Sequence, residues 1–303
     1  MSTSPARSYF RAHGLGNDYL VVDEASFGLP MSAARATLLC DRHRGVGSDG
    51  VLVAVPAKQR GAVAVRIFNP DGSEAEKSGN GVRIFAAWCY ARAGHEALRP
   101  LAIETLGGPV SARLVERGAE GVILCVGMGR VSFRMADLPM LREGGAVPSA
   151  DECWVDRELT IGGRAVRATC LSVGNPHAVL LGAPCDEATL AALGPLVEAH
   201  AQFPRRTNVQ LCEVIDRRTV RALIWERGAG PTLASGSSAC AVVAACVEAG
   251  TLDVDAEIAV RMPGGVLGVR IAHDGALQQT GPVEEIGDGV IADDLWRRLS
   301  DAR

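Results

Sequence analysis

The chain has 303 residues, of which 48% are hydrophobic, and a formal net charge of -4 at pH 7. This length exceeds what one hydrophobic core usually serves, so two domains are expected, and the absence of any block of basic residues argues against a nucleic-acid partner. The N-terminus has no apolar signal core and no apolar run approaches about 18 residues, so we expect a soluble, cytoplasmic protein without a membrane partner.

Short runs of apolar and β-branched residues alternate with turns along the chain and predict many strands. Few long helices interrupt them, and two good candidates are residues 30–44 and 186–203. The predicted strands are residues 18–23, 50–55, 62–68, 101–105, 121–126, 177–181, 208–215, 220–226 and 257–262. The nine cysteines are an odd number without C-x-x-C spacing, which indicates reduced thiols that mostly fill small core positions.

Two further segments each predict a buried helix of similar design. Each places a Ser-Gly pair, beginning at Ser78 or Ser235, ahead of about thirteen mostly apolar residues, and each run stops at a glycine, Gly94 or Gly250. Runs that are apolar almost all round belong inside a domain. Because a helix N-terminus presents unpaired backbone N–H groups and a partial positive charge, both helix starts are suited to bind a carboxylate.

The spacing of polar residues indicates two similar halves. Ser78 and Ser235 are 157 residues apart, and Asn17 and Asn175 are 158 apart. Many strands with one all-apolar helix in each half predict an α/β (α+β) fold of two pseudo-symmetric domains, each a mixed sheet wrapped around a central buried helix. Residues 113–121 look least structured, so we expect an N-terminal domain over 1–120, to which residues 283–303 return, and a C-terminal domain over 121–282.

Several familiar cofactor motifs do not apply. The segment GVGSDG (45–50) matches G-x-G-x-x-G, but a strand-like run follows it where a dinucleotide site needs a helix. The six histidines show no H-x-H or H-x-x-x-H pair, so no zinc site is indicated. Neither lysine lies in a glycine-rich phosphate-binding setting, which argues against pyridoxal phosphate. We therefore expect a site with no metal and no cofactor.

Polar residues gather in tight turns next to both helix starts. Such side chains supply amide donors and acceptors, and an arginine can hold a carboxylate with two parallel hydrogen bonds, so the set suits the charged ends of an amino acid. The candidate substrate-binding residues are Asn17, Asn69, Gly79, Asn80, Asn175, Asn208, Glu226, Arg227, Gly236 and Ser237. Taken singly, each asparagine or serine is more often a turn or cap residue, and the hypothesis depends on their recurrence in both halves.

At these residues the chain resembles diaminopimelate epimerase, from the fold family shared with proline racemase. The motifs HGLGND, DRHRGVGSDG, FNPDGSEAEKSGNG, SVGNPHAV, RRTNV, ERGAGPTLASGSSAC and TGP follow the family's order over nearly the full length. The resemblance implies two similar domains that close over an amino acid, and it implies a homodimer. It also implies two cysteines at the helix starts, one removing the α-proton as thiolate and the other returning a proton to the opposite face.

The chain departs from this pattern at both cysteine positions, which hold Ser78 and Ser235. A thiol ionises near pH 8.5, and earlier at a helix N-terminus, whereas an alkyl hydroxyl is far less acidic, so serine needs a neighbour to take its proton. By the resemblance His177 and Glu226 flank the site, and the candidate catalytic residues are therefore Ser78, Ser235, His177 and Glu226.

The leading functional hypothesis is a cofactor-independent amino-acid epimerase that interconverts LL- and meso-diaminopimelate in lysine and peptidoglycan precursor biosynthesis. Two alternatives stay open. One is a sister isomerase, racemase or dehydratase that acts on another amino acid. The other is a non-catalytic amino-acid binder, which includes a chain whose two cysteines were replaced.

Overall fold

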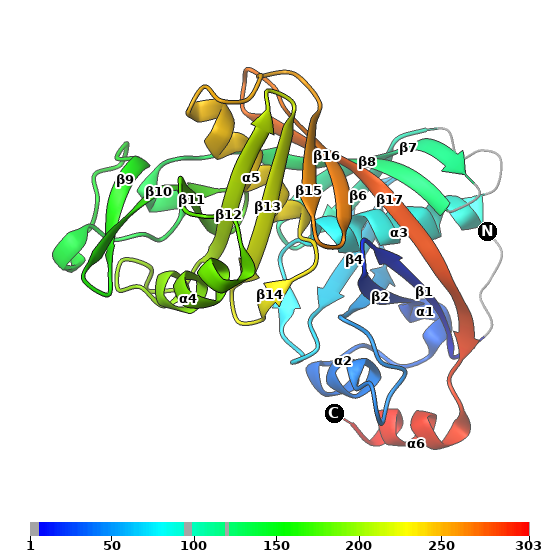
Figure 1. Ribbon diagram of the computed structural model, residues 1–303. Helices are drawn as coiled ribbons and strands as arrows, with labels where there is room; N and C mark the ends of the chain where they lie inside the picture. Colours follow the sequence, from blue (N-terminus) through cyan, green and yellow to red (C-terminus); the bar gives the residue numbers. More distant parts are fainter. Residues whose placement is uncertain (1–5, 94–98, 119–120, 303) are drawn as a thin grey trace. The chain divides into compact units, whose positions relative to one another are not determined.

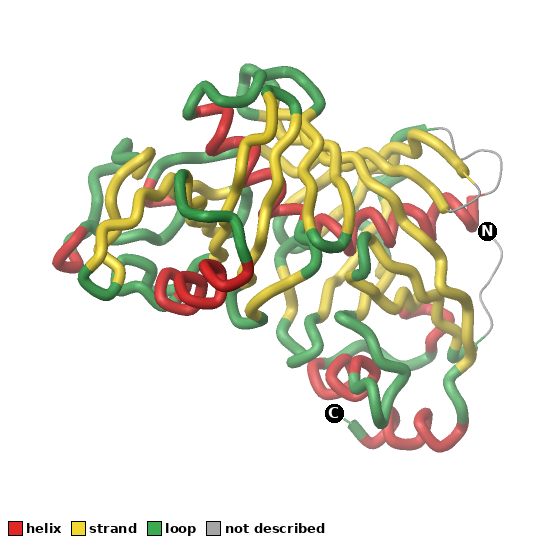
Figure 2. The backbone as a smooth tube through the Cα atoms, in the orientation of Figure 1, coloured by secondary structure: helices red, strands yellow, loops and turns green. Residues whose placement is uncertain are grey.

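The computed structural model describes residues 6–93, 99–118 and 121–302 (Figure 1). The chain divides into two compact units, which we call unit 1 (Met1–Val126 with Gly281–Arg303) and unit 2 (Gly127–Thr280). The sequence-based boundaries fell at 120/121 and 282/283, and residue 120 lies outside the described residues. Strands are the dominant element of both units (Figure 2).

Unit 1 contains a sheet that closes on itself. Its neighbours run β17, β1, β2, β3, β4, β6, β7 and β8, and β8 pairs again with β17. The pairs β2–β3 and β4–β6 are parallel, and the remaining registered pairs are antiparallel. Its strands are β1 (Ser8–Gly14), β2 (Asn17–Asp23), β3 (Val51–Val55), β4 (Val63–Phe68), β5 (Glu74–Ala75), β6 (Leu101–Thr105), β7 (Gly108–Gly118), β8 (Gly121–Arg130) and β17 (Ala276–Val290). Its helices are α1 (Glu24–Phe27), α2 (Ala33–Cys40), α3 (Gly79–Ala93) and α6 (Asp293–Asp301).

Unit 2 repeats this order. Its sheet runs β9, β10, β11, β12, β13, β15, β16 and β17, with parallel pairs at β11–β12 and β13–β15. Its strands are β9 (Trp154–Ile161), β10 (Arg164–Ser172), β11 (Pro176–Leu181), β12 (Asn208–Asp216), β13 (Thr219–Glu226), β14 (Gly230–Thr232), β15 (Ile258–Met262) and β16 (Gly265–Ile271). Its longer helices are α4 (Glu187–Glu198) and α5 (Gly236–Glu248).

The two units are built as one pattern used twice. In each, two antiparallel hairpins are joined by a parallel pair, a short strand precedes a long helix, and a second parallel pair leads to three antiparallel strands. In each, the long helix packs on the sheet: α3 contacts β1, β2 and β7, and α5 contacts β10 to β13, β15 and β16. The predicted α/β fold of two similar domains, each with a sheet around a central helix, is confirmed.

Both central helices are buried on nearly every side. In α5 every residue from Ser238 to Cys246 is buried, and in α3 even the side chain of Arg83 has no exposed surface. Gly250 ends the α5 segment with a φ of 72°, which a glycine adopts without strain. Gly94, the predicted end of α3, lies outside the described residues.

All nine predicted strands are present, and several strands were not predicted. The missed ones, such as β7 and β17, carry many exposed polar residues along part of their length. Residues 113–118, read from the sequence as least structured, form the outer half of β7 and pair with β8, so that reading was wrong. The exposed arginine and glutamate side chains there hide the strand from a reading based on apolar runs.

The glycines of the GVGSDG segment are explained by packing. A Cβ at Gly45 would lie 2.0 Å from the carbonyl oxygen of Leu38, and a Cβ at Gly50 would lie 2.5 Å from the ring of Tyr19. Gly47 has a φ of +82°. Each of these positions therefore favours glycine for reasons of backbone conformation or close packing.

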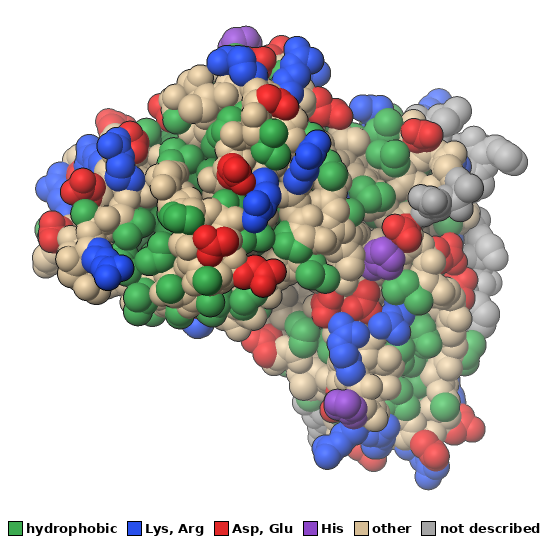
Figure 3. Space-filling view, in the orientation of Figure 1, with side chains coloured by type: hydrophobic (Ala, Val, Ile, Leu, Met, Phe, Trp, Pro, Cys, Tyr) green, Lys and Arg blue, Asp and Glu red, His purple; other side chains and the backbone are tan. Residues whose placement is uncertain are grey.

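The face in Figure 3 shows acidic and basic side chains interspersed. Six of the nine cysteines are buried, as expected for small core residues. Within the described part of the chain, every helix is too short or too polar to cross a membrane.

The core around α3 gives a direct test of the central helix. Ile84 is fully buried there, so Ile84→Ala is expected to lower the free energy of unfolding by about 2–5 kcal/mol, because it leaves a cavity. Ile286, 51% exposed in the same unit, is the matched control, and Ile286→Ala should cost less than about 1 kcal/mol. Urea denaturation measures both, and equal losses would show that α3 is not the centre of this core.

Candidate active site

In unit 1 the candidate residues meet at the start of α3, in an arrangement that we call half-site 1. Ser78 directly precedes the helix, and its Oγ accepts a hydrogen bond from the backbone N–H of Gly81 (3.1 Å). The hydroxyl of Tyr19 lies 3.2 Å from the same Oγ. Tyr19 was not among the predicted site residues, although it stands two positions after Asn17 on one strand and therefore shares its face.

A series of hydrogen-bonded side chains, including two amides, extends from the start of α3. Asn80 donates through Nδ2 to Oδ1 of Asn17 (3.2 Å) and accepts a hydrogen bond from Arg83 (2.6 Å). Asn17 in turn donates to Asp49 (3.1 Å). Asp49 therefore fixes the orientation of the Asn17 amide, and it is a second residue that the motif reading missed.

Behind this chain lies a group of paired charges. Burial alone would raise the pKa of Asp18, but hydrogen bonds from Arg42 and Arg11 hold that pKa below its ordinary value. Arg42 also bonds Asp49 (2.7 Å). Asp49 is thereby held as an acceptor for Asn17, because its charge is balanced by an arginine.

Asn69 is the candidate residue of unit 1 that takes no part in the hydrogen bonds described above. It follows β4, and its side chain donates to Ser73 Oγ (3.0 Å) inside its own turn. The structure thus brings Asn17, Ser78, Gly79 and Asn80 together and places Asn69 in the neighbouring turn that leads to α3.

In unit 2 the corresponding arrangement, half-site 2, surrounds the start of α5. Ser235 is the N-cap, and its Oγ accepts from the backbone N–H of Ser238 and lies 3.4 Å from Ser237 Oγ. The first N–H groups of any α-helix have no acceptor within the helix, so the backbone of Gly236 and Ser237 is suited to an anion. A Cβ at Gly236 would lie 2.2 Å from Oε1 of Gln279, so a larger residue there would require the buried Gln279 side chain to move.

A neutral hydrogen-bonded chain supports half-site 2. Gln210 donates through Nε2 to His177 Nδ1 (3.0 Å) and to Ser238 Oγ (3.0 Å). Because an amide nitrogen only donates, Nδ1 is the acceptor, and Nε2–H of His177 donates to Asn175 Oδ1 (2.9 Å). Complete burial, with the nearby charge of Arg227, lowers the pKa of His177 to about 3. The imidazole is therefore neutral at physiological pH.

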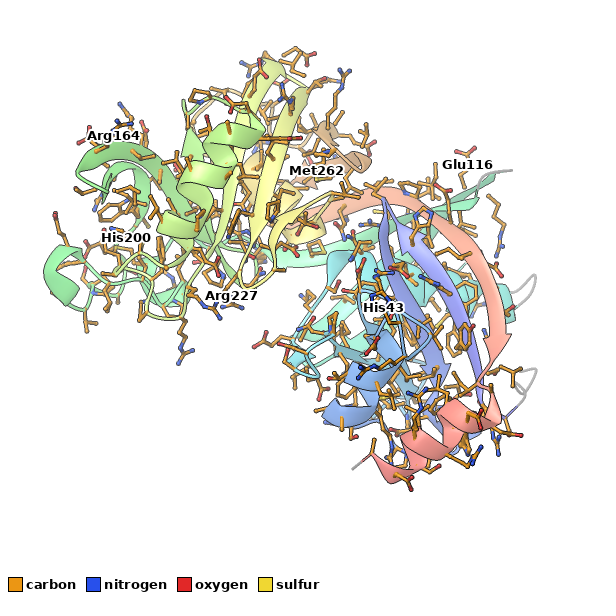
Figure 4. The ribbon with its side chains drawn as sticks, turned by 60° about the horizontal axis from the view of Figure 1, so that its bottom comes forward. His43, Glu116, Arg164, His200, Arg227 and Met262 are labelled. Atoms are coloured by element: carbon orange, nitrogen blue, oxygen red, sulfur yellow. The ribbon has the colours of Figure 1, made fainter. Side chains whose placement is uncertain are left out.

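Asn208 ties the remaining candidates of unit 2 together. Its Nδ2 donates to the carbonyl of Pro176 (2.9 Å), and its Oδ1 accepts from the backbone N–H of Arg227 (3.0 Å). The parallel register of β11 and β12 sets His177 opposite Asn208. Glu226 is the last residue of β13, and Arg227 lies just beyond the strand with an exposed side chain (Figure 4).

The turn that carries Arg227 is anchored from α4. Glu198, buried at the end of that helix, accepts hydrogen bonds from Trp225 Nε1 (2.6 Å) and from the backbone N–H of Gly228 (2.8 Å). Glu198, Gln210 and Gln279 were all missed from the sequence. Only Gln210 left a signal, since it is a polar residue two positions after Asn208 in the buried first half of β12.

Each half-site thus combines a serine hydroxyl, a helix start and oriented amide groups. A helix start stabilises negative charge on a carboxylate, including charge that develops during a reaction. Within the described residues, no group of three or more His, Cys, Asp or Glu side chains has the arrangement of a metal site.

Comparison with known proteins assigns a family to this architecture. The diaminopimelate epimerase family model matches residues 9–134 and 169–286. "Diaminopimelate epimerase 2" of Nostoc sp. is 37% identical over 289 residues, covering 95% of this chain and 96% of the relative. The diaminopimelate epimerase of Desulforudis audaxviator is 39% identical and covers 93% and 98%. Among solved structures, a hydroxyproline epimerase from Agrobacterium vitis superposes with a TM-score of 0.66 at 16% identity, covering 94% of this chain and 90% of that one.

The neutral state of His177 generates a prediction about stability and pH. The unfolded histidine titrates near pH 6.5 and the folded one near 3, so the unfolded state binds more protons between these values and stability falls as the pH is lowered through them. Compared with the wild type, His177→Gln lacks this loss. The stability difference between the two proteins should therefore shift in favour of His177→Gln by up to about 1.4 kcal/mol per pH unit below pH 6.5.

Urea denaturation at pH 7, 6, 5 and 4 measures this effect. His273→Gln, at an exposed turn position in the same unit, is the matched control and should follow the wild type. Parallel curves for the wild type and His177→Gln would contradict the neutral, buried imidazole.

Proposed function

Because the chain belongs to the diaminopimelate epimerase family, we propose that it interconverts LL- and meso-diaminopimelate by moving a proton at Cα without a cofactor. It is an enzyme of the isomerase class. The reaction belongs to lysine biosynthesis, and we extend the proposal to peptidoglycan precursor synthesis. The two isomers differ in configuration at one carbon, so a proton must leave one face of Cα and another must arrive at the opposite face.

The observation that carries the proposal is the pair of serine-capped helix starts, one in each unit. Removal of the α-proton leaves negative charge that spreads onto the adjacent carboxylate, and helix N-termini stabilise such charge. We propose that Ser78 acts on one face and Ser235 on the other. Gly79, Asn80, Gly236 and Ser237 are the proposed carboxylate-binding positions, supported by their places at the two helix starts.

The other proposed binding residues are supported by their fixed geometry. Asn17 is held by Asp49, Asn175 by His177, and Asn208 by Pro176 and Arg227. We propose that Asn69, Asn208 and Arg227 bind the distal amino-acid end of diaminopimelate, and that Glu226 contacts an ammonium group. His177 is proposed to position Asn175, because both of its ring nitrogens are engaged and its burial disfavours the charged form.

The serines also favour a second candidate function. A hydroxyl is a weak base at a site where the family uses a thiol, so an amino-acid binder, or a sister racemase or dehydratase for another amino acid, would retain the binding residues while changing the acid–base pair. Incubation with LL- or meso-diaminopimelate in deuterated water separates these functions. Deuterium at Cα supports the epimerase, whereas binding without exchange supports the binder.

Restoring thiols tests the serine positions. Ser78→Cys combined with Ser235→Cys is expected to raise the epimerisation rate by orders of magnitude, because a thiolate at a helix start is accessible near neutral pH and an alkoxide is not. Each single change should help less, since residues that act as a pair do not contribute additively. The rate is followed by NMR detection of α-deuterium. A slower double variant would mean that partners of the serines carry the proton transfer.

Substrate recognition is tested at Arg227. Arg227→Ala should weaken the binding of diaminopimelate several-fold more than that of alanine, because only diaminopimelate has a distal carboxylate for the guanidinium. Arg205→Ala is the control, since Arg205 is an exposed arginine whose carbonyl accepts from Arg227. Calorimetry with both ligands gives the comparison, and equal losses for the two ligands would refute distal recognition.

We also propose a homodimer, on the basis of the family resemblance, and a location in the cytoplasm, on the basis of a cysteine content that indicates reduced thiols. Analytical ultracentrifugation tests the oligomeric state.

A further inference from the structure

The hydroxyl of Tyr19 contacts Ser78, but the proton transfer proposed above gives this tyrosine no role. Its hydroxyl is 3.2 Å from Ser78 Oγ, and the residue is only 6% exposed. Ser78 Oγ also accepts from the backbone N–H of Gly81 (3.1 Å). Ser78 thus faces a helix start on one side and an ionisable group on the other.

This contact is fixed by the backbone. The strand β2 pairs in parallel with β3, and the N–H of Leu20 donates to the carbonyl of Gly50 (3.1 Å). A Cβ at Gly50 would lie 2.5 Å from Tyr19 Cε1, so the missing side chain gives the ring its space. The position of the phenol beside Ser78 is therefore set by strand pairing and by glycine.

Acidity decides what the pair can do. A phenol has an ordinary pKa near 10, far below that of an alkyl hydroxyl, and each unit of difference is worth about 1.4 kcal/mol in proton transfer. A negative charge on the phenol oxygen would also lie one hydrogen bond from the start of α3, where the helix dipole favours an anion. Of the two hydroxyls in contact, that of Tyr19 is the more acidic and therefore the one that loses its proton more readily.

We propose that Tyr19 is a positioning residue that activates Ser78 through a proton relay. The inference rests on the proposed epimerase function. In the forward step the Cα–H bond breaks, and its electron pair stays on Cα and the carboxylate. The proton passes to Ser78 Oγ as the proton of Ser78 passes to the Tyr19 phenolate. In the reverse step the phenol proton returns through Ser78 to Cα, so each step conserves protons and charge.

Half-site 2 is built differently, since Ser235 contacts the hydroxyl of Ser237 and the N–H of Ser238. In the proposed relay, the proton removed from Cα is therefore held on Tyr19, in unit 1. The relay also gives a role to this buried tyrosine, which has none in the binding proposal.

The principal test is Tyr19→Phe, which keeps the ring and removes the oxygen. We expect the rate of α-deuterium exchange to fall at least tenfold while diaminopimelate binding measured by calorimetry changes less than twofold. Tyr9→Phe, on the neighbouring strand β1, is the matched control and should leave the rate unchanged. An unchanged rate in Tyr19→Phe, in a wild type that does exchange, would overturn the relay and leave the epimerase function intact.

A thiol background separates a relay from a structural role. Ser78→Cys supplies a group that ionises without help, so adding Tyr19→Phe to it should cost less than threefold, compared with at least tenfold in the serine protein. A structural role would give the same loss in both backgrounds, and that result would overturn the proposal.

Phenol titration tests the contact independently of turnover. The chain has three tyrosines, so the ultraviolet difference between the wild type and Tyr19→Phe isolates the ionisation of Tyr19. Ser78→Ala removes a donor to the phenolate and should move this ionisation upward by at least half a pH unit. An unmoved titration would refute the coupling. If the wild type fails to exchange any diaminopimelate isomer, the proposed function fails, and this titration still decides whether the pair is coupled.

The charged groups on the elements around β2 also enter any pH profile. Asp18 and Asp49 are paired with Arg11 and Arg42, and Glu74 is paired with Arg66. Each of these carboxylates has an arginine partner, so a limb of the profile that disappears in Tyr19→Phe alone belongs to the phenol. Further charged or titratable groups nearby are His13 on β1, which is paired with Glu284, Asp23 at the end of β2, and Glu76, Lys77 and Arg83 on the segment that carries Ser78.

Discussion

The burial of a helix inside each sheet is the constraint on which the rest of this structure depends. In a helix exposed to water, the first backbone N–H groups can donate hydrogen bonds to the solvent. In a helix enclosed by strands, these groups lie within the unit, where their acceptors must come from other groups. Ser78 and Ser235 satisfy part of this need through their Oγ atoms. The first N–H groups of a helix have no acceptor within the helix itself, and a carboxylate is a suitable acceptor for such groups. The carboxylate binding that we propose at these helix starts is therefore compatible with the way that each unit builds its core.

The two units support their helix starts with opposite electrostatics. In unit 1 the supporting residues are charged and extend to Arg42, whose side chain is half exposed, so water screens the ion pairs. In unit 2 the chain through Asn175, His177, Gln210 and Ser238 is buried and neutral. An enclosed site pays heavily for an unpaired charge, and a neutral imidazole between two amides avoids that cost. Similar folds thus hold similar hydroxyls with different supporting chemistry.

The elements that the sequence predicts correctly are those with a clear local pattern of residues. Nine strands followed from runs such as residues 50–55, and both central helices followed from a serine start and an apolar run. The strand β17 escaped because its 15 residues include a proline and three glycines, and because its exposed half carries acidic side chains. It is a strand only because strands of both units pair with it. Local propensity contains no information about such partners.

The residues of the candidate site likewise differ in how well the sequence predicts them. Ser78, Asn17 and Arg227 stand in recognisable motifs, and the family match supports those motifs. Tyr19 and Gln210 are buried side chains within β2 and β12, and their roles depend on contacts with residues 59 and 28 positions away. Glycine patterns were ambiguous for a related reason. Gly50 accommodates an aromatic ring, and no count of glycines could distinguish that ring from a phosphate.

The last strand of each structural repeat begins in its own unit and ends in the other. The strand β8 starts in unit 1 and continues past Val126 into unit 2, and β17 starts in unit 2 and continues past Thr280 into unit 1. Since side chains alternate along a strand, a single inserted residue near Thr280 would invert which side chains are buried in the rest of β17. A change of length at this junction would therefore disturb the side chains that β17 contributes to the core of unit 1, although the inserted residue lies at the edge of unit 2.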